Sequence, residues 1–362
     1  MALDHYVTLG RSGLRVSPLA LGAMTFGEDL GWGASVQESE AMLDRYVDLG
    51  GNFVDTANGY TKGHSETIIG DHLGHDRAKR DRLVLATKFS TNLYPGDPNG
   101  GGSSRKAVIA AAEQSLRRLR TDYIDLYWLH NWDKHTPIEE TMAALDALVR
   151  DGKVRYVGIS DTPAWKTAQA QLVAQVRGWA PVIAIQIEYS LGERTVEGEL
   201  VPMAQELGMG VVPWSPLGGG KLSGKYTRVN AGGDPSGRAA LMGPKMTDTL
   251  FAIVDELGRI ARDLGSTIPR VALAWVMARP GVASAIMGVR TVAQLDDDVQ
   301  ALGVRLTPEQ TARLDALSTP QLPFPLPFLA GAAAALHQGG TTVNGVPSTP
   351  HPFAAQHPGD HY

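Results

Sequence analysis

The chain has 362 residues, of which 43% are hydrophobic and 20% are charged, as in a soluble globular protein. Its net charge of −5 argues against a nucleic-acid binder, which would carry a basic face. The lack of cysteine excludes disulfides, thiolate metal sites and cysteine nucleophiles. No apolar run approaches the roughly 20 residues that span a bilayer, and the N-terminus has no signal-peptide core. We therefore expect a cytoplasmic protein with neither membrane nor nucleic-acid partners.

Short apolar runs alternate with segments of helical spacing along most of the chain. Residues 6–16 predict a β-hairpin around a Gly-containing turn. The apolar runs that follow predict strands over residues 17–22, 52–55, 83–88, 124–130, 153–160, 181–190, 209–220 (which includes a Gly-rich loop) and 282–288. This alternation predicts the α/β class, a (β/α)8 TIM barrel with an N-terminal hairpin and two extra helices, rather than a doubly wound sheet.

Helix boundaries and domain limits follow from the composition. Thr136 is expected to cap a helix that has Pro137 at its first position and runs to Arg150. Residues 1–319 are predicted to form the barrel domain. Residues 320–362 are rich in Pro, Gly and Ala and poor in charge, which predicts a tail that is partly folded over the barrel mouth or loosely ordered.

Ionisable residues end three consecutive predicted strands. Asp55, Lys88 and His130 each follow an apolar run, and Tyr60 comes five residues after Asp55. In a parallel sheet that is covered on both faces, a charged last residue is seldom there for packing. Because barrel active sites lie at the C-terminal ends of the strands, these four side chains are candidate catalytic residues.

These four residue types suit one kind of chemistry. An ammonium beside the phenol stabilises the phenolate, and the carboxylate holds the ammonium charged and in place. Tyr60 could then give a proton to an oxyanion while His130 orients a carbonyl oxygen, which suits reduction of C=O by hydride. A barrel hydrolase or isomerase would need a metal or a nucleophile. His72 and His75 lie three residues apart without a third ligand at fitting spacing, so no metal site is expected.

Two Gly- or Arg-bearing segments are candidates for binding a phosphate-containing cofactor. No G-x-G-x-x-G follows a strand, which argues against a Rossmann fold. GGKLSGKY over 219–226 has the skeleton of a phosphate loop, but Tyr226 stands where a magnesium-binding Ser or Thr is needed. This loop could still cradle a pyrophosphate. The second segment, 288–298, places Arg290 at the start of a helix, where anions bind.

With these motifs, the chain from residue 6 to 317 resembles the aldo-keto reductase family, in its bacterial and potassium-channel β-subunit-like branch. Asp55, Tyr60, Lys88 and His130 stand at the positions of that family's catalytic tetrad, and GKVRYVGIS, QIEYS, WSPLGGGKLSGKY and GVRTVAQLDDD also carry the resemblance. The resemblance implies NADPH-dependent reduction of aldehydes and ketones to alcohols, with the cofactor held in an extended site.

The resemblance also implies which positions contact that cofactor. The nicotinamide end would be met by Gly22, Ala23, Met24 and Asp55, its carboxamide by Ser160 and Gln186, and its ring by Tyr189 or Trp214. The pyrophosphate would be lined by Ser215, Leu217, Gly219 and Lys225, and the adenosine half would meet Gly288, Arg290, Gln294 and Asp298.

Three positions depart from the family pattern. Asp161 and Asp298 stand where the family commonly has Asn, and Gly288 stands where a Lys often binds the 2′-phosphate. Arg290 is then the main cation for binding the 2′-phosphate. The expected cofactor is NADPH, and NADH is not excluded.

Other questions stay open at this level. An intact tetrad does not separate an enzyme from a nucleotide-binding regulatory subunit with slow turnover. The substrate pocket is expected to be built by the loops at 26–35, 91–104 and 221–244 and by the tail. Trp32, Trp128 and Trp132 either line that cleft or pack in the core. A homo-oligomer is one option for assembly.

Overall fold

The computed structural model describes residues 2–226, 228 and 246–355. The chain divides into two compact units, Met1–Thr319 and Pro320–Tyr362. Among the described residues, no helix combines the length and the apolar character needed to cross a bilayer.

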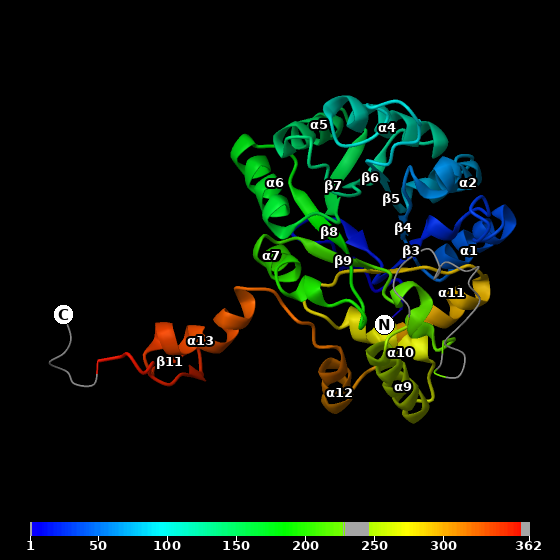
Figure 1. Cartoon of the computed structure of the whole chain (residues 1–362). Helices are drawn as coiled ribbons and strands as arrows, with labels where there is room; N and C mark the ends of the chain where they lie inside the picture. Colours follow the sequence, from blue (N-terminus) through cyan, green and yellow to red (C-terminus); the bar gives the residue numbers. More distant parts are fainter. Residues whose placement is uncertain (1, 227, 229–245, 356–362) are drawn as a thin grey trace. The chain divides into compact units, whose positions relative to one another are not determined.

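The first unit is built on a sheet of eight parallel strands (Figure 1). The strands are β3 (Leu19–Gly22), β4 (Phe53–Asp55), β5 (Val84–Phe89), β6 (Ile124–Leu129), β7 (Val154–Ser160), β8 (Val182–Glu188), β9 (Gly210–Trp214) and β10 (Ala285–Met287). They pair in chain order, and β10 pairs with β3. Val211 of β9 forms a parallel bridge with Val282, just before β10, which brings the two ends of the sheet together. The predicted (β/α)8 barrel is confirmed.

Helices surround the sheet (Figure 1). They are α1 (Val36–Asp48), α2 (His64–Leu73), α3 (Arg77–Asp81), α4 (Arg105–Arg118), α5 (Ile138–Arg150), α6 (Ala164–Arg177), α7 (Leu200–Glu206), α9 (Asp248–Asp263), α10 (Ile268–Met277), α11 (Val292–Val299) and α12 (Pro308–Ser318). Ser35 caps α1 and Ser104 caps α4 through their side chains. Thr136 does not cap α5 as predicted, because its hydroxyl donates to Asp133 instead and Pro137 takes the N-cap position.

The predicted N-terminal hairpin is present as β1 (Val7–Thr8) and β2 (Arg15–Val16). Leu9 and Val16 are buried in the cluster that fills the barrel interior, together with residues of the barrel strands. Gly10 has a φ of 58° and lies so close to Ile183 that an added Cβ would stand 2.2 Å from its carbonyl oxygen. The hairpin therefore fills one part of the interior, and the C-terminal ends of the strands remain for the site.

The second unit contains regular structure that the composition did not predict. It has helix α13 (Leu326–Gln338) and a two-stranded hairpin of β11 (Thr342–Val343) and β12 (Val346–Pro347). Folding of the tail over the barrel mouth stays a prediction.

Candidate active site

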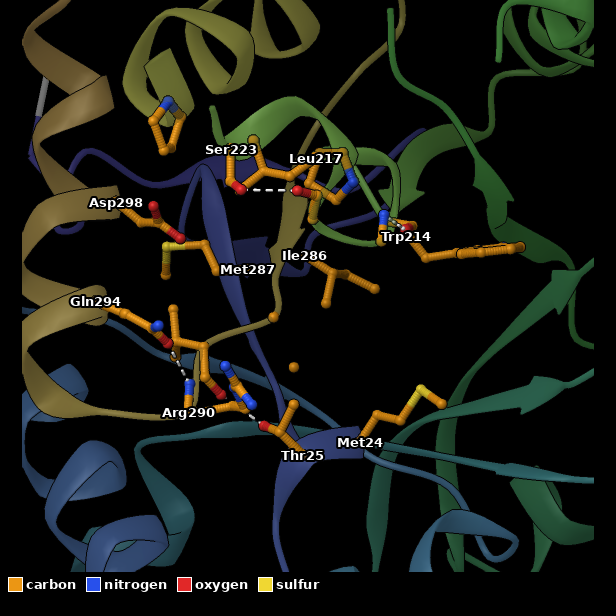
Figure 2. A pocket seen from close by; sticks show the side chains of 18 of the residues that line it. Met24, Thr25, Trp214, Leu217, Ser223, Ile286, Met287, Arg290, Gln294 and Asp298 are labelled. Carbon is orange, nitrogen blue, oxygen red and sulfur yellow. Dashed lines mark hydrogen bonds between the residues drawn. The ribbon is translucent and has the colours of Figure 1, made fainter. Parts of the chain in front are cut away.

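A cavity of about 980 Å³ opens at the C-terminal ends of the barrel strands (Figure 2). Its lining comes from segments far apart in the chain: Gly22, Met24 and Thr25 at and just after the end of β3, Ser160 at the end of β7, Trp214 to Leu217 at and just after the end of β9, and residues between 286 and 298. Asp55, Tyr60 and His130 line it as well. This volume is at the upper end of the ~300–1,000 Å³ found for ligand pockets, so the cavity is larger than a small carbonyl compound requires.

Lys88 is the centre of a buried polar network next to this cavity. Its ammonium forms an ion pair with Asp55 and donates hydrogen bonds to the carbonyl oxygen of Thr56 at 2.8 Å and to the Tyr60 hydroxyl at 3.1 Å. Gln186 Nε2 donates to the other carboxylate oxygen of Asp55 at 2.9 Å. Asp55, Tyr60 and Lys88 thus lie together, as their places at the ends of neighbouring strands predict.

The charge on Lys88 is maintained by its partners. Burial alone lowers the pKa of a lysine, but the charge of Asp55, together with Tyr60, outweighs burial and raises the pKa of Lys88 above its usual value. The ammonium is therefore charged at neutral pH, with no access to solvent.

His130 lies beside Tyr60 at the fourth tetrad position. The two ring centroids are 5.8 Å apart and the rings meet edge to face. Burial, with a contribution from the charge of Lys88, lowers the pKa of His130 to about 3. The imidazole is therefore neutral at physiological pH, and its Nδ1 is buried without a hydrogen-bond partner among the described residues.

The backbone that carries Tyr60 is in an uncommon conformation. Thr61 and Lys62, directly after it, have φ values of 45° and 58°, in the left-handed region. Strained residues of this kind concentrate at functional sites, where surrounding structure holds them. The Thr61 hydroxyl is one such anchor, since it donates to the carbonyl oxygen of Phe26 at 3.1 Å.

The part of the cavity nearest the tetrad offers unpaired polar atoms and a flat aromatic ring. Ser160 Oγ is buried without a hydrogen-bond partner among the described residues. Trp214 lines the cavity, and its indole N–H donates to Asp161 at 3.0 Å. An added Cβ on Gly22 would stand 2.6 Å from the Ile286 side chain and 2.9 Å from the Met287 carbonyl oxygen, so glycine allows β3 and β10 to approach closely there.

The loop after β9 is a tight turn built from residues with positive φ. Ser215 has a φ of 52°, and Gly218, Gly219 and Gly220 have φ values of 59°, 67° and 93°. Ser215 Oγ accepts a hydrogen bond from the amide of Gly219 at 2.7 Å, which fixes the turn. The amides of Gly218 and Gly220 donate to the carbonyl oxygens of Ser215 and Leu217 at 2.7 and 3.0 Å, so the amides of all three glycines are used within the turn. Lys225 lines the cavity beside this loop.

The far end of the cavity carries charged groups of both signs (Figure 2). Gln294 accepts a hydrogen bond from the backbone amide of Arg290 at 2.8 Å, which holds both residues at the start of α11. Asp298 is only 7% exposed, and burial, followed by the charge of Asp297, raises its pKa to about 7.

Two predicted contact residues do not line the cavity. Ala23 is fully buried and does not line the cavity, although its neighbours Gly22 and Met24 do. Tyr189 is buried as well, and its hydroxyl donates to Glu197 at 2.7 Å while its ring packs against Trp275. Of the two aromatic candidates for ring stacking, only Trp214 faces the cavity. The other predicted cofactor positions line it: Gly22, Met24, Asp55, Ser160, Gln186, Trp214, Ser215, Leu217, Gly219, Lys225, Gly288, Arg290, Gln294 and Asp298.

Several lining residues were not found from the sequence. Thr25, Ile286 and Met287 belong to this group, and each lies within two residues of a predicted position. Trp128 is interior packing. Most of the predicted pocket loop at 221–244, namely residue 227 and residues 229–244, lies outside the described part of the chain. Within the described part, no cluster of three His, Cys, Asp or Glu residues could hold a metal ion.

The site is therefore a cavity at the mouth of the barrel. It opens onto the network formed by Tyr60, the charged Lys88 and Asp55. The chain belongs to the aldo/keto reductase family, whose model matches residues 18–319. It is 39% identical over 314 residues to the oxidoreductase YrpG of Bacillus subtilis, a match that covers 84% of this chain and 93% of that protein. It is 34% identical over 335 residues to norsolorinic acid reductase of Aspergillus flavus, covering 90% of this chain and 84% of that protein. Aldo-keto reductase ausK of Aspergillus calidoustus is 35% identical over 326 residues, covering 87% and 82%. The family identifies the protein as an oxidoreductase of carbonyl compounds.

Proposed function

We propose that the protein reduces aldehydes and ketones to alcohols with NADPH, and that Tyr60 is the general acid. The observation that carries the proposal is the buried, charged Lys88, whose ammonium donates to the Tyr60 hydroxyl at 3.1 Å beside the cavity. A positive charge at this distance favours release of the phenolic proton.

The proton transfer needs only residues of this chain. The substrate carbonyl oxygen binds between Tyr60 and His130, and Tyr60 gives up its proton as negative charge develops on that oxygen. Lys88 stabilises the phenolate that forms, and Asp55 keeps Lys88 charged. His130 stays neutral, so it orients the oxygen as a hydrogen-bond donor without adding a charge. In the reverse direction the phenolate takes the proton from an alcohol.

The lining of the cavity fits a nicotinamide dinucleotide. Two groups can hold a carboxamide: Ser160 Oγ, which has no hydrogen-bond partner among the described residues, and the amide oxygen of Gln186. The Nε2 group of Gln186 already donates its hydrogen bond to Asp55. Trp214 supplies a surface for the ring, and the loop after Trp214, together with Lys225, lines the part of the cavity where a pyrophosphate would lie. The dinucleotide would supply the hydride.

The preference for NADPH rests on Arg290 at the far end of the cavity. No ion pair of its guanidinium is present among the described residues, and a guanidinium binds phosphate in bidentate geometry. Arg290→Met should therefore raise KM for NADPH by about tenfold or more and change KM for NADH by less than about twofold. Equal changes for both cofactors would contradict the assignment.

The test of the function is a cofactor-oxidation assay. Purified protein is mixed with NADPH and, separately, with NADH, and a panel of aromatic and aliphatic aldehydes is added while absorbance of the reduced cofactor is followed. We expect oxidation that requires an aldehyde and is faster with NADPH. Tight cofactor binding without turnover on any aldehyde would instead indicate a nucleotide-binding regulatory subunit.

A further inference from the structure

Three buried hydroxyl side chains lie between the segments that surround the tetrad. They belong to Thr56 and Thr61, which flank Tyr60 in the chain, and to Ser65 in the first turn of α2. Burying a hydroxyl is unfavourable unless its hydrogen bonds are made, so the partners of these groups show which segments they hold together. We refer to Thr56, Thr61 and Ser65 as the hydroxyl cluster.

The hydrogen bonds of Ser65 connect three segments. Its Oγ donates to the carbonyl oxygen of Ala23, the residue after β3, at 2.7 Å. Because a hydroxyl has one hydrogen to donate, Ser65 Oγ is the acceptor in its hydrogen bond with Thr56 Oγ1, 2.8 Å away. The Ser65 amide donates to Thr61 Oγ1 at 2.9 Å. One residue of α2 therefore joins the chain after β3, the chain after β4 and the turn that follows Tyr60.

Two of these segments bear directly on the tetrad. The carbonyl oxygen of Thr56 accepts a hydrogen bond from the Lys88 ammonium at 2.8 Å. Thr61 follows Tyr60 directly and has a φ of 45°. A β-branched residue in the left-handed region is strained, and it keeps that conformation only where its surroundings hold it. The two hydrogen bonds of the Thr61 hydroxyl hold the turn in this conformation.

The cluster therefore controls the separation of the Lys88 ammonium and the Tyr60 hydroxyl, which is 3.1 Å. Thr56 fixes an acceptor of the ammonium, and Thr61 fixes the turn that carries the phenol. Both are bonded to Ser65, so the two sides are held relative to each other. The attraction between an ammonium and a phenolate falls as the distance between them grows. A relaxed turn would leave Tyr60 a weaker acid even with all four tetrad residues present.

We propose that the hydroxyl cluster, with Ser65 as its central residue, positions the Tyr60 hydroxyl at hydrogen-bonding distance from Lys88, so that Tyr60 can donate its proton. The members of the cluster are not among the residues that line the cavity. They are therefore positioning residues, which act through Tyr60 and not by contact with the substrate. This inference rests on the proposed function and adds to it the residues that hold its general acid in place.

The test compares two cluster variants with two matched controls. Ser65→Ala and Thr61→Val each remove one hydroxyl of the cluster. Ser284 is also buried, and its Oγ also donates to a backbone carbonyl oxygen at 2.7 Å, so Ser284→Ala is the control for Ser65→Ala. The buried Thr141 on α5 donates to a carbonyl oxygen at 2.9 Å, so Thr141→Val is the control for Thr61→Val. Urea denaturation should show similar losses of stability in a variant and its control.

The kinetic readout is the pH profile. In alcohol oxidation with NADP+ the phenolate of Tyr60 is the base, so the rate rises with pH as the phenol ionises. We expect the midpoint of this rise to move up by about one pH unit in Ser65→Ala and Thr61→Val, with KM for NADP+ within about twofold. Thr61→Ser restores the hydroxyl and should restore the midpoint. An unmoved midpoint in the cluster variants, or an equal shift in the controls, would overturn the proposal.

A spectroscopic titration keeps the test independent of turnover. Tyr60 is one of ten tyrosines, so its ionisation is isolated as the difference in tyrosinate absorbance between each protein and the same protein with Tyr60→Phe added. We expect a midpoint about one pH unit higher in Ser65→Ala and Thr61→Val and no change in the two controls. If no aldehyde is reduced but this shift is present, the proposed reductase activity fails and the positioning role stands. An unmoved midpoint would overturn the positioning role, whatever the activity.

Discussion

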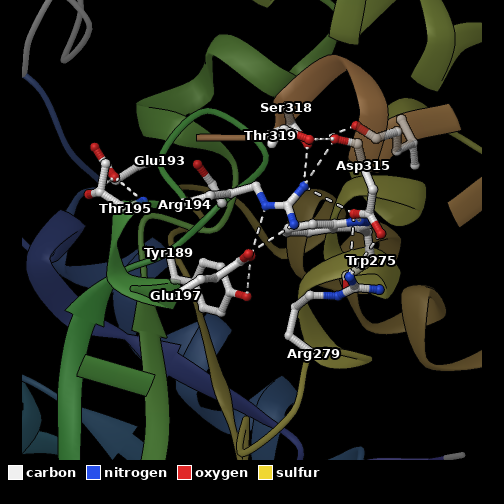
Figure 3. A network of polar contacts seen from close by, with 12 residues as sticks. Tyr189, Glu193, Arg194, Thr195, Glu197, Trp275, Arg279, Asp315, Ser318 and Thr319 are labelled. Atoms are coloured by element: carbon white, nitrogen blue, oxygen red, sulfur yellow. Dashed lines mark hydrogen bonds and ion pairs between the residues drawn. The ribbon is translucent and has the colours of Figure 1, made fainter. Parts of the chain in front are cut away.

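Two buried polar networks in the barrel unit each contain a tyrosine among charged side chains, yet only one of them opens onto the cavity. In the first, Lys88 donates to Tyr60 and is paired with Asp55. In the second, Tyr189 donates to Glu197, which is paired with Arg194 (Figure 3). The charge next to the two tyrosine hydroxyls therefore differs in sign. The cation beside Tyr60 favours loss of the phenolic proton. At Tyr189, burial and then the neighbouring carboxylate raise the pKa above its usual value.

The second network joins parts of the fold. Asp315 of α12 accepts hydrogen bonds from Arg194, from Arg279 and from the indole of Trp275 (Figure 3). The two guanidinium groups lie 5.0 and 4.5 Å from the Trp275 ring centroid. Burial and ion pairing alone therefore do not indicate a catalytic role. A reactive atom must also reach the cavity, and no residue of the second network is among those that line the cavity at Tyr60.

The largest expected effect comes from removing the cation of the first network. Lys88→Met should lower kcat about 10³-fold, within the range attributed to general acid catalysis. It should also lower the free energy of unfolding by about 3–5 kcal/mol, because Asp55 is left as an unpaired buried charge. Urea denaturation and steady-state kinetics measure the two effects. Adding Asp55→Asn to Lys88→Met should restore much of the stability but none of the activity. Retention of kcat within about tenfold in Lys88→Met would contradict the network's role.

Asp298 is a buried carboxyl group outside both networks, and no hydrogen bond from the described residues reaches it. Its pKa is raised to about 7 in the folded protein, so between the unfolded value of 3.8 and about 7 the folded state holds a proton that the unfolded state releases. The contribution of Asp298 to the free energy of unfolding is thus largest below pH 3.8 and is lost as the pH rises to about 7.

Asp298→Asn removes this dependence. The free energy of unfolding of the Asp298→Asn variant should equal that of the unmodified protein near pH 4. Above pH 7 it should be higher by up to about 4 kcal/mol, because each pKa unit corresponds to about 1.36 kcal/mol. Urea denaturation across pH 4–9 measures the difference. A difference that is constant over this range would contradict the shifted pKa of Asp298.

Breaking the second network should reduce stability without changing the chemistry. Asp315→Ala leaves Arg194 and Arg279 short of an acceptor and should cost about 2–3 kcal/mol in the free energy of unfolding. KM for NADPH and kcat should stay within about twofold below the unfolding transition. A changed KM with unchanged stability would mean that this network acts on the site.

The smallest expected effect distinguishes the two aromatic candidates for the cofactor. Tyr189→Phe should cost about 1 kcal/mol of stability, through the lost bond to Glu197, and leave the Kd of NADPH unchanged. Trp214→Ala should weaken NADPH binding by about tenfold, because its ring lines the cavity. Fluorescence titration with NADPH measures both. Weaker binding in Tyr189→Phe and not in Trp214→Ala would reverse the assignment.

The residues that could be predicted from the sequence are those at strand ends. Asp55 is the last residue of β4, Lys88 is the last but one of β5, and His130 follows β6; the parallel topology brings all such ends to one edge. Their separation in the chain does not matter, because the pairing of β4, β5 and β6 brings them together.

Contacts that depend on backbone conformation could not be predicted. Asp161 reaches Trp214 from a left-handed backbone with a φ of 38°, which the residue type does not signal. Tyr189 lies one residue beyond the end of β8 and is buried against Trp275 instead of facing the cavity. Helix α13 was missed because its Ala- and Leu-rich sequence follows a Pro-rich segment that obscures it.

The central claim is that Tyr60 donates the proton and plays no part in holding the cofactor. Tyr60→Phe keeps the ring and removes the hydroxyl, so one sample can be used to measure both the Kd of NADPH by fluorescence and the rate of a single turnover with a saturating aldehyde. We expect the Kd to stay within about twofold while the single-turnover rate falls about 10²–10⁴-fold. A rate close to that of the unmodified protein would contradict the account.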